Sequence, residues 1–472
     1  MKSSTDKEAL LLLTHLIEFV YRLLWGDLFT LPVGGGIGIS PMVVLLFTAG
    51  IWFTLRTRLL PVRLFRDMIA AVCEKTRTRR GFPPSRPWWC PPPPGWAWAT
   101  WWAWWRRFRP AVQARCSGCG SLPCWALPPL LSSPRWPRNT ASPTRCTAAG
   151  AAAGRYYLHA LAERRRGKKL RHSVTAALFA VSGLICWCGI SQVISNSVSS
   201  AFQNAFHIPP LTTTLVLTAL AALIVLRKNA TVKSLDVMVP IMAVCYFVLT
   251  VGILVVNFRQ LPAVLGRIFA EAFGLRQIAA GGFGAVLMNG VKRGLFSNEA
   301  GSGSAPCAAA AAACDDPVKM GFVQALGVLI DTVVICSCTA FLMLLVPQDL
   351  TAGLSGMDLL QTAMQYHLGG FGTVFIAATL ALFSFSTFLG VLYYARGNVA
   401  YLCGDNWWSQ TVYKLIALVM LLIGGLQAYT VVWDLGDVGI GLMTIFNMIA
   451  LYPLSGEAMD ALNDYEKRKK LQ

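Results

Sequence analysis

Charged residues are scarce in this sequence of 472 residues, since Asp, Glu, Lys and Arg together make up only 13% of it. Soluble globular domains carry about 25% charged residues. In contrast, 55% of the residues are hydrophobic, and apolar runs of roughly 20 residues recur between positions 40 and 453. A run of that length crosses the hydrocarbon core of a bilayer as a helix. The composition therefore excludes a soluble globular domain and predicts an all-α polytopic membrane protein.

Motifs of enzymes, metal sites and disulfide frameworks are missing as well. The sequence contains no nucleotide-binding or hydrolase motif. Cys116 and Cys119 resemble half of a zinc site, but no second Cys or His pair follows at a suitable spacing. Most other cysteines fall within apolar runs, where they pack as small apolar side chains. We therefore expect no enzyme, no metal centre and no disulfide framework, and nothing indicates the symmetric polar rings of a channel.

Acidic residues are absent from one long stretch, between Lys75 and Ala162. Within it, residues 81–146 hold 14 of the 25 Pro, 10 of the 16 Trp and eight Arg. Proline breaks helices, and Arg at the bilayer centre costs about 2.5–3.5 kcal/mol even on lenient insertion scales. We therefore predict irregular structure for residues 76–155. The alternative interpretation is a basic, Trp-rich patch that binds nucleic acid or lipid.

Apolar runs outside this segment predict nine helical spans. They lie at 40–56, 173–203, 210–226, 236–257, 281–297, 318–346, 369–394, 411–430 and 432–453. Clusters of Lys and Arg favour cytoplasmic loops, and the clusters here share one side only if residues 67–166 cross the membrane zero or two times. With two crossings the total is eleven. We expect a single transmembrane domain, residues 1–472, in the cell membrane, with an external N-terminus and a cytoplasmic C-terminus.

The stretch LFSNEAGSGSAP, residues 295–306, ends an apolar run with an acidic residue and two closely spaced glycines. The pattern favours a broken helix, and a break at membrane depth exposes N–H and C=O groups that lipid cannot satisfy. Such breaks persist where they line a cavity, and there freed amides bind anions and freed carbonyls bind cations. Glu299 would then be an intramembrane ionisable group. The alternative is a loop at the membrane edge with Glu299 in water.

Further polar residues lie within the predicted spans. Ser386 and Thr387 could supply two oxygen ligands for a sodium ion, or alternatively bond to carbonyls of their own helix. Asp331 lies near the middle of its span and is a site candidate, because ionisable groups at that depth are costly. Asn196 is the least specific of the set, since Asn in a membrane helix often only links helices.

Three stretches resemble the sodium:alanine symporters, also described as alanine or glycine:cation symporters. They are NGVKRGLFSNEAGSGSAPCAAAAAA (289–313), LGVLIDTVVICSCTA (326–340) and FSFSTFLGVLYYARGN (383–398). The resemblance covers about residues 40–75 and 156–460. It implies the leucine-transporter-like fold, which consists of two inverted repeats of five helices. In this chain, one extra helix would precede the two repeats. The first and sixth core helices of that fold are unwound in mid-membrane.

The resemblance also implies site residues. In that fold the amino acid and sodium bind between the two unwound helices, and the eighth core helix supplies hydroxyls to the ion. Ser386 and Thr387 match these hydroxyls, and Asn196 matches an Asn of the third core helix. The residues that match the sixth core helix, and hence the substrate site, are Asn298, Glu299, Ala300, Gly301, Gly303 and Ser304. Ile194 and Arg396 depart from the family pattern and leave the exact substrate preference open.

Residues 81–126 stand where the family has its first two core helices and a stretch like STATRVGMGNLVG. Tryptophan has one codon, so the run TWWAWWR at residues 100–106 fixes most of its nucleotides. Read from one nucleotide earlier, these codons encode x-Val-Gly-x-Val, where x is Leu, Met or Val. The same shift over the whole stretch permits an apolar, Gly-broken helix of the family type. Our hypothesis is that residues 76–155 are a wrong-frame reading of symporter codons.

We therefore predict symport of a small neutral amino acid, alanine or glycine, with Na⁺ as coupling ion and no other cofactor. Freed amides of the broken helices would hold the substrate carboxylate, and freed carbonyls with Ser386 and Thr387 would hold the ion. The expected partners are the amino acid, Na⁺ and the lipid bilayer, and no nucleic acid. The alternative is an inactive, frameshifted symporter product that inserts in the membrane but does not transport.

Overall fold

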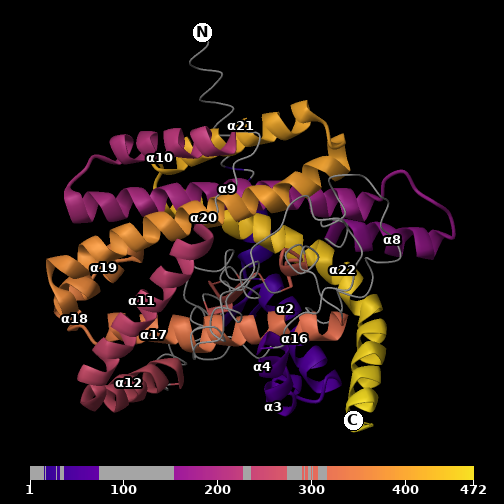
Figure 1. Ribbon diagram of the computed structural model, residues 1–472, viewed down its shortest axis with the longest axis horizontal. Coiled ribbons are helices and arrows are strands. Elements are labelled where there is room, and N and C mark those ends of the chain that lie inside the picture. The colour runs from indigo at the N-terminus through magenta and orange to yellow at the C-terminus, as the bar shows by residue number, and fades with distance from the viewer. Residues whose placement is uncertain are drawn as a thin grey trace, which may run out of the picture.

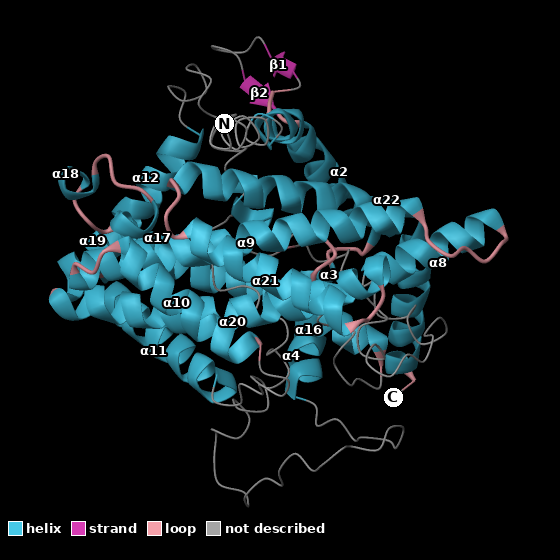
Figure 2. Ribbon diagram, turned by 90° about the horizontal axis from the view of Figure 1, so that it is seen from above, coloured by secondary structure: helices cyan, strands magenta, loops and turns pink. Residues whose placement is uncertain are grey.

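The computed structural model describes five stretches of the chain. They are residues 15–73 without 16, 28 and 32–36; 154–226; 235–273; 290–306 without 292, 296–298 and 300; and 316–471. Within these stretches the chain is helical, apart from an antiparallel hairpin of β1 (Phe29–Leu31) and β2 (Ile37–Ile39) next to α2 (Figure 2). The prediction of an all-α membrane protein is confirmed at this level. The predicted irregular structure of residues 76–155 lies, except for the last two residues, outside the described stretches.

Five helical stretches of the described chain are long and apolar enough to cross a membrane. They are α9 (Val174–Phe206), the continuous run of α16 (Pro317–Leu329), η2 (Ile330–Cys336) and α17 (Ser337–Leu344), and α20 (Gly370–Cys403), α21 (Trp407–Gly424) and α22 (Tyr429–Lys470). A sixth is a pair bent by 70°, Ile241–Val256 with Phe258–Ala270. The five stretches and Ile241–Val256 overlap predicted spans, whereas Phe258–Ala270 lies outside all of them. Most of the predicted span 281–297 lies outside the described residues.

The other helices are shorter. Two of them, α2 (Pro41–Arg56) and α10 (Pro210–Val225), are apolar and coincide with predicted spans. The bent pair belongs to α11 (Leu235–Val256), η1 (Phe258–Gln260) and α12 (Leu261–Phe273). The remaining helices are α3 (Leu60–Arg63), α4 (Phe65–Cys73), α8 (Gly154–Arg166), α18 (Gln348–Thr351) and α19 (Gly356–Leu368).

Local sequence explains where several helices begin and end. Ser40 precedes α2, and its hydroxyl accepts a hydrogen bond from the backbone N–H of Val43. Asp316 caps α16 in the same way, through the N–H of Val318. Short polar side chains are favoured there because they satisfy N–H groups that have no partner in the first turn. Gly404 ends α20 with a φ of 82°, a conformation that glycine adopts without strain.

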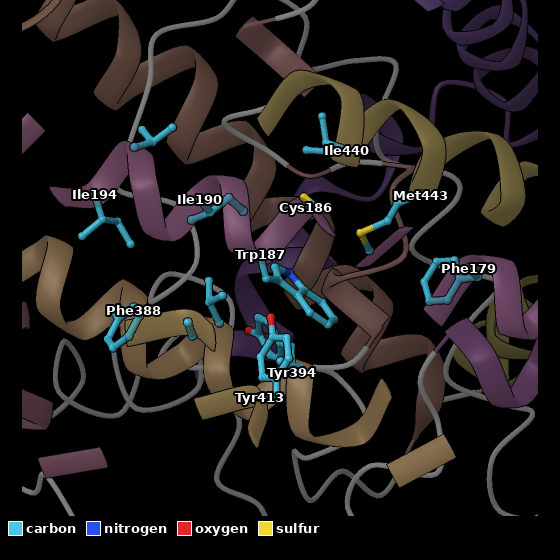
Figure 3. Close-up of a cluster of buried hydrophobic side chains, with 14 of the residues drawn as sticks. Phe179, Cys186, Trp187, Ile190, Ile194, Phe388, Tyr394, Tyr413, Ile440 and Met443 are labelled. Atoms are coloured by element: carbon cyan, nitrogen blue, oxygen red, sulfur yellow. The ribbon is translucent and has the colours of Figure 1, made fainter. Parts of the chain in front are cut away.

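Helix α9 lies at the centre of the main core, and α20, α21 and α22 all pack along it (Figures 1 and 2). Close packing with α22 depends on small residues, because a methyl group added at Gly189 would lie 2.8 Å from the Cα of Gly436. Figure 3 shows where the apolar side chains of three helices meet. They are Cys186 and Trp187 of α9, Phe388 and Tyr394 of α20, and Ile440 and Met443 of α22.

Helix α22 is longer than predicted, because it continues through Pro453 to Lys470. Its C-terminal part, residues 454–470, turns away from the bundle at the right of Figure 1 and is referred to as the α22 tail. The tail is rich in charge, and ion pairs attach it to α3, α4, α8 and the start of α16. The pairs are Arg63–Glu466 (2.7 Å), Asp67–Lys469 (2.6 Å), Arg164–Glu457 (2.5 Å) and Asp316–Arg468 (2.9 Å). Hydropathy marks only the apolar part of this helix, which explains the difference.

Candidate functional site

The predicted helix break between Leu295 and Pro306 is present. Residues 290, 291 and 293–295 are helical, residues 301–303 form a turn, and helical structure resumes at Ala305. Glu299, Gly301 and Gly303 have φ angles of 49°, 86° and 89°, all in the left-handed region that favours glycine. Such angles cannot continue a right-handed helix, so the GSG sequence ends it.

The break lies inside the molecule. The side chain of Glu299 is buried, with a residue exposure of 6%, and Ser304 is buried at 2%. This burial does not agree with the alternative of an edge loop that leaves Glu299 in water. Gly301 and Gly303 are buried as well. Asn298 and Ala300, the other two predicted substrate residues, lie outside the described residues.

Ser302, which the sequence did not single out, organises the turn. Its hydroxyl donates to the carbonyl of Glu299 at 2.6 Å, and its backbone N–H donates to the same oxygen at 3.1 Å. The hydroxyls of Ser302 and Ser304 lie 3.0 Å apart. Serine commonly bonds to nearby backbone in this way where a helix stops. The only sequence signal was its place between two glycines.

Side chains from three helices cover the break. A methyl group added at Gly301 would lie 2.8 Å from Cε of Met448, on α22. One added at Gly303 would lie 2.9 Å from the ring of Phe179, on α9, and 3.0 Å from Oδ1 of Asn447, on α22. Leu46 of α2 lies near Gly301 as well. Glycine avoids these close contacts as well as the strain of a positive φ, which explains the GxG pattern structurally.

The predicted sodium ligands lie on α20. Ser386 and Thr387 are both buried, and both hydroxyls donate to the carbonyl of Phe383, at 2.8 Å and 2.9 Å. The structure therefore shows the alternative arrangement, in which hydroxyls bond to their own helix. This arrangement keeps the two oxygens side by side, and their role as ion ligands stays a prediction.

Asn196 links two helices. Its amide nitrogen donates to the carbonyls of Gly424 and Gln427, at 3.2 Å and 2.9 Å. These carbonyls lie at the C-terminal end of α21, where the last C=O groups of a helix have no helical partner. The observed role is thus the interhelical link that the sequence left as the alternative, and contact with substrate stays a prediction.

Asp331 lies within the π-helical segment η2, in the middle of the continuous run from α16 to α17. Its exposure is 7%. Short π-helical insertions often occur at functional sites, because the wider turn displaces side chains from the regular helix pattern. This local structure supports Asp331 as a candidate site residue, and its role stays a prediction.

An ion pair next to the break was not predicted. Arg293, just before the break, bonds to Asp437 of α22 at 2.6 Å, and the side chain of Asp437 is wholly buried. The guanidinium also lies 4.5 Å above the ring of Trp433. The Arg293 side chain is 30% exposed, so the pair lies at the edge of the buried region. The pair therefore attaches the first half of the broken helix to α22.

The arrangement is suited to binding rather than to covalent chemistry. The described residues contain no group of three or more His, Cys, Asp or Glu side chains that could hold a metal ion. What the site offers is backbone, hydroxyl and amide groups around a buried turn. Such groups can hold a zwitterion or a hard monovalent cation, and a sodium ion would need only oxygen ligands.

Comparison with known proteins places these features in a family. The model of the sodium:alanine symporter family matches residues 150–472. The "Probable sodium/glutamine symporter GlnT" of Bacillus subtilis is 34% identical over 475 residues, which cover 97% of this chain and 92% of that protein. The "Amino-acid carrier protein AlsT" of the same organism is 36% identical over 63% of each chain. The "Sodium/alanine symporter AgcS" of Methanococcus maripaludis is 32% identical over 63% of this chain and 66% of that protein.

The last two alignments cover slightly less than two thirds of the relatives. The family model, however, matches well over half of this chain, and it includes the break and both hydroxyls of α20. The family and these relatives are transporters, so the prediction that the protein is not an enzyme is confirmed. The chain belongs to the sodium:alanine symporter family.

Proposed function

We propose that the protein couples the entry of sodium to that of a small neutral amino acid, alanine or glycine, by alternating access. The observation that carries the proposal is the buried helix break at residues 299–304, which is covered by α9 and α22. A break at this depth leaves N–H and C=O groups without helical partners. The N–H groups would hold the substrate carboxylate, and the carbonyls would share the sodium ion with Ser386 and Thr387.

The same proposal includes the architecture that the family resemblance implies. In it, two inverted repeats of five helices follow one extra helix, the N-terminus is external and the C-terminus is cytoplasmic. Four consecutive basic residues, 467–470, end the α22 tail. They support this orientation, since Lys and Arg favour cytoplasmic segments.

The close cover of the break favours a short substrate. Phe179, Asn447 and Met448 all lie within about van der Waals distance of where glycine side chains would begin. Alanine or glycine fits such a site best. Glutamine is the second candidate, because the relative that aligns with 97% of this chain is named a probable sodium/glutamine symporter.

Uptake into proteoliposomes tests this function. The experiment, like the transport tests of all variants, uses the chain with residues 76–155 restored to the symporter frame. With an inward sodium gradient, labelled alanine should accumulate, and it should stop accumulating when the gradient is collapsed or Na⁺ is replaced by K⁺. Unlabelled glycine should compete with alanine, and glutamine should compete more weakly. Stronger competition by glutamine would favour the second candidate. Uptake that is indifferent to Na⁺ would contradict the proposal.

The sodium assignment is tested by removing both hydroxyls of α20. In the double variant Ser386→Ala, Thr387→Ala, the sodium concentration that gives half-maximal uptake should rise roughly tenfold, which corresponds to about 1.4 kcal/mol of lost binding. Thr379→Ala is the matched control. Thr379 is buried in the same helix, and its hydroxyl also bonds to its own helix, at the carbonyl of Phe375. If the double variant and the control had the same sodium dependence, the two residues would not be ion ligands.

We further propose that residues 76–155 are a wrong-frame segment and that the chain as written inserts in the membrane without transporting. Support comes from composition, because the eight Arg and 14 Pro of residues 81–146 do not suit two membrane crossings.

A further inference from the structure

We propose that Asn447 is a positioning residue of the broken helix. Its amide holds the turn at Gly301, which the proposed function assigns to ligand binding, in one shape. The inference deepens the proposed function and rests on it for its transport measurement. None of the predicted site residues lies on α22, so this assigns a new element to the site.

The hydrogen bonds of Asn447 fix its amide on both sides. Its Nδ2 donates to the carbonyl of Gly301 at 2.7 Å, and its Oδ1 accepts a hydrogen bond from the hydroxyl of Tyr157, on α8. The residue is buried, with an exposure of 2%. The carbonyl of Gly301 can only accept a hydrogen bond, so the amide nitrogen must face the break and the oxygen faces Tyr157. A flipped amide would place its oxygen against that carbonyl and lose the bond to Gly301.

Asn447 also limits the size of the residue that position 303 can hold. Its Oδ1 lies 3.0 Å from where Cβ would stand on Gly303, so its side chain occupies the space that any larger residue would need. Thr444 and Met448, on the same face of α22, lie against Gly301. One side of α22 is thus the support on which the whole turn lies.

Because the chain turns at Gly301, its carbonyl does not receive the hydrogen bond that it would accept within a regular helix. Asn447 supplies a donor in place of that bond. A buried carbonyl without a partner is costly, and the turn would change to satisfy it. Holding that carbonyl against α22 fixes the φ angles of the two glycines. The substrate and ion then meet a preorganised turn, which lowers the cost of ordering it on binding.

The test compares Asn447→Ala and Asn447→Asp with Asn398→Ala. Asp keeps the size of Asn and the acceptor for Tyr157 but loses the donor to Gly301. Asn398, on α20, is a matched control, because it is fully buried, accepts a bond from Arg155 of α8 at 2.8 Å, and donates to the backbone carbonyl of Ala180 at 3.1 Å. It thus makes the same kinds of bond without touching the break.

Hydrogen–deuterium exchange on the purified full-length chain gives the first measurement. Both Asn447 variants should speed exchange in peptides that contain residues 299–306 by about tenfold or more, whereas Asn398→Ala should leave these peptides unchanged. Unchanged exchange at the break in the Asn447 variants would overturn the proposal. This measurement does not need transport, so it separates failure of this inference from failure of the proposed function.

Alanine uptake by the frame-restored chain gives the second measurement. The Asn447 variants should raise the apparent KM for alanine about tenfold, with a smaller change in maximal rate. All three variants are expected to lower thermal stability, so stability alone does not distinguish them. If Asn447→Ala lowered only the maximal rate and the stability, as Asn398→Ala should, Asn447 would be a structural residue and the proposal would be wrong.

Discussion

Replacing Gly301 with leucine should abolish sodium-driven uptake while leaving the protein in the membrane. The residue has a φ of 86°, where a side chain is strained by about 1–2 kcal/mol. The added Cβ would also lie 2.8 Å from Cε of Met448, and the rest of the leucine would have to enter the buried turn. The bulk would occupy the place where backbone groups are free to bind. Uptake of labelled alanine, normalised to the amount of protein in the membrane, measures the effect.

Two further variants keep this result interpretable. Gly301→Ala adds only a Cβ, whose neighbour is the flexible end of Met448, so uptake should fall but remain measurable. Gly252→Leu is the control, since a Cβ at Gly252 of α11 would meet nothing within 4 Å. It should transport at close to the original rate. Normal uptake by Gly301→Leu would show that the turn at residue 301 does not form the binding site.

Restoring the reading frame should change the protein from inactive to active, which is the largest effect we expect. The gene should lack one nucleotide near codons 75–80 and contain one extra nucleotide near codons 147–156. Correcting both replaces the Pro-, Trp- and Arg-rich segment with apolar, Gly-containing helices. The written chain should show no sodium-driven uptake, and the corrected chain should accumulate alanine.

Resequencing of the gene decides the origin of the segment, and uptake by both chains decides its effect. A chain corrected at only one of the two positions is the control, because everything after codons 147–156 would then be read out of frame. If resequencing finds the written codons and the written chain transports robustly, the hypothesis is wrong.

Sequence patterning predicted the spans well because membrane helices are defined by local composition. The apolar runs at 173–203 and 369–394 became α9 and α20. Their ends were less certain, since a helix does not stop where hydropathy falls. Helix α22 continues for 17 residues beyond Pro453. The ion pairs on that part join it to residues such as Asp67, about 400 positions away, which no local pattern reveals.

The site was predicted in part for the same reason. A GSG turn after an acidic residue is a local signal, so the break at Gly301 was predictable. Ser302 acts locally too, but serine is too common to be a signal. Asn447 and the pair Arg293–Asp437 act across helices. Their roles depend on how α22 lies beside the break, and only the folded arrangement shows it.

Helix α22 is attached in two places to different parts of the molecule. The half before Pro453 lies against α9 and carries Asn447, whereas the tail after it is bound to α3, α4, α8 and the start of α16 by ion pairs. Proline leaves one hydrogen bond of the helix unmade, so bending costs least there. A change in the angle between the two parts of α22 would therefore cost least at Pro453. This proline lies between the part of the helix that supports the break and the part that ion pairs attach to α3, α4, α8 and α16.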